Sequence, residues 1–185
     1  MALMPQWAYE VTAFIGPDRR GVLLALTEAY QGLQNPKEAI TCLRQLRKLD
    51  PEDVAVRLSL AELLMETQPE GKKVWKEVIQ LAEDIDNDSA VHTAMLLYKA
   101  QALRQLGLLD AASSLLTTAR RRKKDRSDEL LNALQYERAL VYEAQGKEKN
   151  RRVSSKSCML KIRIMKMWRN GWDSNLKLRR QYRYV

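Results

Sequence analysis

Glycine and proline are scarce in this chain, with seven glycines and five prolines among its 185 residues. Both residue types interrupt helices, so their scarcity removes most obstacles to helix formation. Alanine, leucine, glutamate, lysine, arginine and glutamine are abundant, and all of them favour helices. No segment alternates apolar and polar residues with a period of two, as a half-buried strand does. The composition therefore predicts an all-α fold.

Long apolar runs and cysteine pairs are also absent from the sequence. The apolar runs are only a few residues long, well short of the roughly 20 residues needed to cross a bilayer. The N-terminus lacks the basic start, apolar core and cleavage site of a secretory signal, which favours a cytoplasmic location. Cys42 and Cys158 provide neither a disulfide framework nor a metal-ligand pair, and Cys42 is predicted to be a small buried residue.

Residues suited to catalysis or cofactor binding are equally few. His92 is the only histidine, so acid–base pairs and histidine metal sites have no second member. A capping or solvated role is predicted for it. The glycines follow no phosphate-binding spacing. The carboxylates Glu83, Asp84, Asp86 and Asp88 are predicted to lie at a helix end and in a solvated loop. The sequence thus predicts a protein without catalysis, cofactor or bound metal.

Residues 93–126 have the pattern of a helical hairpin. Small residues, apolar residues and a turn glycine follow in a fixed order: Ala100, Leu103, Leu106, Gly107, Ala111, Ala112, Leu116 and Ala119. The alanines allow two helices to approach closely, and the leucines supply apolar surface that one hairpin cannot bury alone. The basic run at 120–124 is predicted to close the second helix, where cations complement the helix dipole. Such a unit requires stacked neighbours.

Similar units precede and follow this hairpin. Residues 20–53 contain Tyr30, a turn at 34–36 and a closing Asp50-Pro51. Residues 54–87 form a second unit, whose second helix is predicted to carry Val74, Val78, Leu81, Ala82 and Ile85. An incomplete fourth unit covers residues 130–149. Small residues recur on the four first helices at spacings of 34, 39 and 39 residues: Thr27, Ala61, Ala100 and Ala139.

This pattern resembles the tetratricopeptide repeat, a unit of about 34 residues folded as helix, turn, helix. The turn at 67–71 is longer than the family's, and the spacings of 39 indicate inserted loop residues. The resemblance implies a right-handed superhelix of stacked antiparallel hairpins over residues 20–149, acting as a non-catalytic protein-interaction scaffold. Residues 1–19 are expected either to cap the first hairpin as a helix or to be partly disordered.

In the family, first helices line a concave groove that takes a peptide or helix of a partner protein. Glu28, Glu62 and Glu143 would favour a partner with basic and apolar residues. Members that bind a terminal carboxylate use a clamp of lysine, asparagine and arginine; Leu24 and Glu28 stand where its first two residues are expected, which argues against that ligand. That these are merely solvated helix faces stays an open alternative. The groove residues that the resemblance implies are Leu24, Glu28, Gln31, Leu58, Glu62, Met65, Leu97, Gln101, Arg104, Tyr136, Leu140 and Glu143.

The net charge of +9 resides in the C-terminal tail. From residue 150 onward there are eleven basic residues and one acidic residue, whereas the rest of the chain carries a charge of −1. A nucleic-acid-binding fold usually presents a basic face on its structured part, so nucleic-acid binding is expected only through the tail. Residues 150–185 are predicted to be poorly packed. In an alternative function, their interleaved charges and aromatic residues form an arm for RNA or anionic lipid.

The repeat pattern stops after Gly146, and this suggests a second hypothesis about the tail. Arg151, Ser155 and Cys158 occupy positions where small or apolar packing residues belong. The genetic code permits a shifted reading frame that continues the repeat, so the tail is either a functional arm or a frameshift product. The nucleotide sequence across codons 145–176 distinguishes the two. The unfinished fourth repeat leaves an apolar face that can promote self-association.

Deletion of residues 150–185 is expected to remove any steep, salt-dependent affinity for nucleic acid, because the remaining chain is nearly neutral. Binding of an RNA oligonucleotide to the full and the truncated chain, at two salt concentrations, measures this. A steep salt dependence that survives in the truncated chain would contradict the scaffold interpretation.

Overall fold

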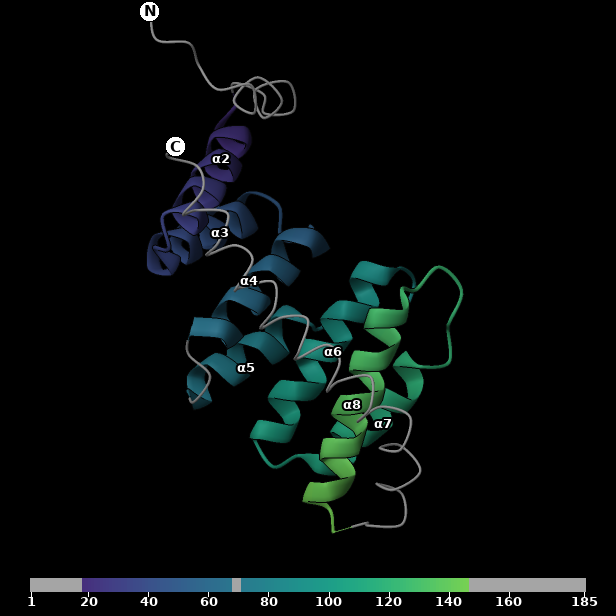
Figure 1. The fold of residues 1–185 in the computed structure, drawn as a ribbon. Helices are drawn as coiled ribbons and strands as arrows, with labels where there is room; N and C mark the ends of the chain where they lie inside the picture. Colours follow the sequence, from purple (N-terminus) through teal and green to yellow (C-terminus); the bar gives the residue numbers. More distant parts are fainter. Residues whose placement is uncertain (1–17, 68–70, 147–185) are drawn as a thin grey trace, which may run out of the picture. The chain divides into compact units, whose positions relative to one another are not determined.

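A computed structural model of the protein describes residues 18–67 and 71–146. Within these ranges the chain forms helices and no strands (Figure 1), which confirms the predicted all-α class. The N-terminal segment at 1–19, expected either to cap the first hairpin or to be partly disordered, lies outside the described residues apart from Asp18 and Arg19, as does the basic tail at 150–185. The helices are α2 (Arg19–Gly32), α3 (Pro36–Leu49), α4 (Val54–Thr67), α5 (Lys72–Leu81), α6 (Ala90–Gln105), α7 (Leu109–Ala119) and α8 (Asp128–Ala144).

The chain divides into two compact units, Met1–Leu108 and Leu109–Val185. In the first unit the helices pack in chain order from α2 to α6, and α4 also packs against α6. In the second unit α7 packs against α8, and the side-chain amide of Gln145 donates to Asp110 Oδ1 at 2.8 Å. The division falls inside the hairpin predicted at 93–126, directly after the turn that follows α6.

Side-chain caps mark the beginning of four of the described helices. At the start of α4, Asp53 Oδ1 accepts hydrogen bonds from the Ala55 and Val56 amides at 2.9 and 3.1 Å. Asp18 Oδ1 accepts a hydrogen bond from the Gly21 amide at 2.7 Å at the start of α2. Ser89 and Ser127 cap α6 and α8 in the same way, through their hydroxyl oxygens. Helix α3 begins instead with Pro36, whose fixed φ and missing N–H suit the first helical position. Local sequence therefore sets these helix starts.

Helices α2 and α6 each end in a turn, and the two turns have the same hydrogen-bond pattern. After α6, the Leu108 amide donates to Leu103 O at 2.9 Å and the Gly107 amide donates to Arg104 O at 3.0 Å. After α2, the Asn35 and Gln34 amides make the equivalent bonds to Tyr30 O and Gln31 O. This pair of bonds requires one residue in the left-handed region, which is Gly107 at φ 79° in one turn and Gln34 at φ 55° in the other.

The small residues predicted for the four first helices are all buried. Thr27 is 6% exposed, Ala61 and Ala100 are 0% exposed, and Ala139 is 8% exposed. Helix α3 buries one complete face between α2 and α4, through Ala39, Ile40, Cys42, Leu43 and Leu46. The prediction that Cys42 is a small buried residue is confirmed. Burial of close-packed alanines and leucines is the main source of stability in such short helices.

Two helix ends differ from the sequence predictions. Ala82 and Ile85 lie beyond the end of α5, because Asp84 adopts φ 56°, a left-handed conformation through which a helix does not continue. Ile85 nevertheless packs against the core. The basic run at 120–124 follows the end of α7 at Ala119 and lies in the turn and loop after it. Five consecutive cations repel one another on a helix, which favours this end point.

Two cations from neighbouring helices hold the C-terminal end of α5. Arg57 of α4 is buried, and its guanidinium donates to Leu81 O at 2.6 Å and to Glu83 O at 2.7 Å. Lys99 of α6 donates to Ala82 O at 2.9 Å. The last carbonyls of a helix lack intrahelical partners and carry partial negative charge, so both cations are favourably placed. These contacts connect α4, α5 and α6.

Replacement of Arg57 by methionine is expected to lower the free energy of unfolding by about 2 kcal/mol, because the carbonyls of Leu81 and Glu83 lose charged donors. Urea unfolding followed by circular dichroism measures the change. Arg44→Met is the matched control: Arg44 pairs with Glu77 on the surface at 2.9 Å, and the loss of an exposed pair costs about 1 kcal/mol or less. Equal effects of the two changes would contradict the role assigned to Arg57.

Candidate partner-binding surface

The groove residues predicted on α2, α4 and α6 differ in their exposure. Glu28, Gln31 and Glu62 are exposed. Leu24, Leu58 and Met65 are half-buried and pack against the core, so they serve mainly the interior of the first unit. The predicted residues of α6 are the least accessible, since Leu97 is only 7% exposed and Gln101 and Arg104 are half-buried.

The equivalent predicted residues of the second unit lie on α8. Tyr136 and Leu140 are half-buried there, and Glu143 is exposed near the end of the helix. Nine of the twelve predicted residues belong to the first unit and three to the second. The geometry of a candidate site is defined within the first unit alone.

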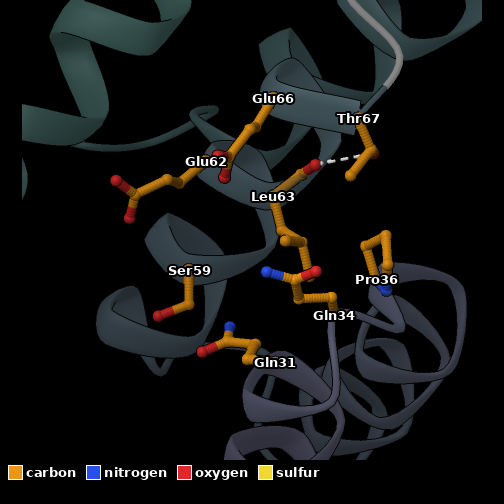
Figure 2. A pocket seen from close by; sticks show the side chains of 8 residues that line it. All are labelled: Gln31, Gln34, Pro36, Ser59, Glu62, Leu63, Glu66 and Thr67. Atoms are coloured by element: carbon orange, nitrogen blue, oxygen red, sulfur yellow. Dashed lines mark hydrogen bonds between the residues drawn. The ribbon is translucent and has the colours of Figure 1, made fainter. Parts of the chain in front are cut away.

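A cavity of about 590 Å³ opens between α2 and α4 in the first unit. Gln31, Gln34 and Pro36 come from the end of α2 and the start of α3, and Figure 2 shows them facing side chains of α4. Two predicted groove residues, Gln31 and Glu62, line this cavity. The contributions of α4 are Ser59, Glu62, Leu63, Glu66 and Thr67.

Local structure explains how the lining is positioned. The turn after α2 puts Gln34 in the left-handed conformation and leads directly into Pro36, the first residue of α3. On α4, Ser59, Glu62 and Glu66 lie on one face, three and four residues apart. Thr67 follows Glu66 at the end of α4, and its hydroxyl donates to Leu63 O at 2.7 Å (Figure 2).

Six of the lining residues were missed by sequence reasoning: Gln34, Pro36, Ser59, Leu63, Glu66 and Thr67. The row on α4 carries a signal that could have found it, because polar residues recur at positions 59, 62 and 66 on a largely apolar helix. Gln34 carries no such signal. Gln34 lines the cavity because of the direction in which its side chain points from the turn.

The cavity is acidic. Glu62 and Glu66 are exposed carboxylates one helical turn apart, and among residues 18–67 and 71–146 neither forms an ion pair. The Tyr98 hydroxyl of α6 donates to Glu62 Oε1 at 3.1 Å. Burial raises the pKa of the Tyr98 phenol strongly, and the negative charges of Glu62 and Glu66 raise it further. Both carboxylates therefore act electrostatically on the same phenol.

Other chemistry is sparse in the part of the chain that the structure describes. His92 lies in the first turn of α6, where its amide donates to the Ser89 cap and its ring Nδ1 lies 2.6 Å from Ser89 Oγ. Among the described residues, no group of three or more histidine, cysteine or acidic side chains could hold a metal ion. No described helix has the length and apolar character needed to span a bilayer.

The first unit is thus a stack of short helices with repeated turns, buried small residues and an open cavity between alternate helices, which defines the class of helical-repeat proteins. Residues 20–63 match the family model described as Tetratricopeptide repeat. The match covers α2, α3 and most of α4, and it supports the resemblance of this part of the chain to a tetratricopeptide repeat protein. No curated protein and no solved structure matches the chain. Tetratricopeptide repeats generally mediate protein–protein interactions and are typically non-catalytic scaffolds.

The raised pKa of Tyr98 predicts a loss of stability in alkali. Above about pH 10 the unfolded phenol ionises while the folded phenol stays protonated, so the unfolded state binds fewer protons and the free energy of unfolding falls as pH rises. We expect Tyr98→Phe to remove this contribution. Urea unfolding at pH 9 and pH 11 should show a smaller decrease in the variant than in the wild type. An identical decrease in both proteins would show that Tyr98 titrates normally.

Proposed function

We propose that this protein is a non-catalytic interaction scaffold that binds a peptide or helix of a partner protein along the first helices of its repeats. The cavity between α2 and α4 is the observation that carries this proposal, because both are first helices and the cavity is open to a ligand. Its volume, about 590 Å³, is in the range of sites that hold a small molecule or a few side chains.

Charge indicates the chemistry of the partner. Glu28, Glu62 and Glu66 are exposed on α2 and α4, on or beside the cavity, whereas no basic side chain is among the described residues that line it. Complementary potentials attract the correct partner and exclude like-charged ones. A partner segment with basic and apolar residues therefore fits this surface. Tyr136, Leu140 and Glu143 of α8 are the proposed counterparts in the second unit.

Charge reversal tests the proposal directly. We expect Glu28→Lys combined with Glu62→Lys to abolish capture of the specific partner proteins that the wild-type protein retains, because like charges would then face each other. Affinity capture followed by mass spectrometry measures the loss.

The matched control carries the same charge change elsewhere, as Glu52→Lys with Glu83→Lys. Both residues are exposed in turns and neither lines the cavity. The control variant should retain the partners, and circular dichroism should show that both variants are folded. If the Glu28/Glu62 variant retains every specific partner, the proposed surface is wrong.

A further inference from the structure

We propose that the cavity between α2 and α4 is a subsite for one arginine side chain of the partner segment. This inference rests on the proposed function and names the chemistry of one contact within it. The groups that line the cavity favour a guanidinium over an ammonium, an apolar side chain or a metal ion.

Hydrogen-bond acceptors surround the cavity on two sides. Helix α4 presents the carboxylates of Glu62 and Glu66 and the hydroxyl of Ser59, and the end of α2 presents the amide groups of Gln31 and Gln34 (Figure 2). Among the described lining residues none is basic. The acceptors thus outnumber fixed donors, and a ligand rich in donors satisfies them.

The two carboxylates are arranged for a cation. Glu62 and Glu66 stand at positions i and i+4 on α4, where like charges repel and destabilise the helix. Tyr98 binds Oε1 of Glu62 at 3.1 Å and restrains this carboxylate, while Oε2 makes no hydrogen bond within the described residues. A bound cation relieves the repulsion and gives both carboxylates a positively charged partner.

The shape of the lining favours arginine over lysine. A guanidinium is planar and has five donors, so it can bond carboxylates on α4 and an amide oxygen of Gln31 or Gln34 at the same time. The ammonium of lysine is a compact point charge and reaches fewer of these separated acceptors. Pro36 and Leu63 supply apolar surface for the aliphatic part of the side chain.

The other ligands fit less well. A leucine or phenylalanine would displace water from the carboxylates of Glu62 and Glu66 without donating a hydrogen bond in return, and such desolvation of a charge is costly. A divalent cation such as Ca²⁺ takes six to eight oxygen ligands, and no described cluster of acidic residues could hold a metal ion. The carboxylates and amides together match the guanidinium.

Acetyl-arginine methylamide is the probe that tests this subsite in the full chain. We expect it to shift the NMR resonances of the side-chain amides of Gln31 and Gln34 in a saturable titration. Acetyl-citrulline methylamide has the same shape without the charge and should cause no saturable shift, and the lysine analogue should bind several-fold more weakly.

Two Glu→Gln variants test which carboxylate the arginine probe requires for binding. Glu66→Gln removes a cavity carboxylate with little change in shape, and we expect about a tenfold loss of affinity for the arginine probe, as for the loss of one charge-assisted hydrogen bond. Glu52→Gln makes the same charge change at an exposed turn residue outside the lining and should leave the affinity unchanged. No binding of the arginine probe, equal binding of citrulline, or equal losses in the two variants would overturn the inference.

The two experiments distinguish failure of the arginine subsite from failure of the proposed function. If the arginine probe fails to bind while Glu28→Lys with Glu62→Lys still abolishes partner capture, the surface is used but the arginine subsite is wrong. If the probe binds as expected while the charge-reversed variant retains every partner, the subsite exists and the proposed scaffold surface is wrong.

Discussion

The packing of α3 against both α2 and α4 is the interaction on which the rest of the first unit depends. Helix α3 buries a continuous face between these neighbours, with Ala39 fully buried and Leu43 and Leu46 nearly so. A short hairpin of α2 and α3 cannot bury this surface alone, so α4 must follow. Because α3 holds both first helices, it also sets the separation between them in which the cavity opens. The candidate site is therefore a consequence of core packing.

Charges on α4 are divided between structure and surface. Arg57, near the start of the helix, is buried and bonds the carbonyls at the end of α5. Glu62 and Glu66, five and nine residues further on, are exposed at the cavity. Helix α6 shows the same division of roles. Lys99 donates to Ala82 O at the end of α5, and Tyr98 donates to Glu62 at the cavity. Inward cations satisfy helix-end carbonyls, and outward carboxylates keep their capacity to bind a partner.

The sequence predicted the helices and their repeat well, and the candidate site only in part. Small residues at equivalent positions predicted burial correctly at Thr27, Ala61, Ala100 and Ala139, because close helix approach admits few other side chains. Gln31 and Glu62 were predicted for the groove and line the cavity. Leu24, Leu58 and Met65 are half-buried and also pack against the core. A periodic pattern identifies a helix face to within one residue position, and that uncertainty decides between core and groove.

By itself, the sequence determined the all-α class, the approximate helix boundaries, the repeated turns and the presence of the carboxylates Glu28 and Glu62 on the first helices. These properties arise from local propensities, caps and periodicity, which act over a few residues. Only the tertiary structure decided which groups meet: Gln34 with Glu66 at the cavity, Tyr98 with Glu62, and Arg57 with the end of α5. These groups lie more than 20 residues apart in the chain. Their meeting depends on the distance and rotation between packed helices, which no local pattern encodes.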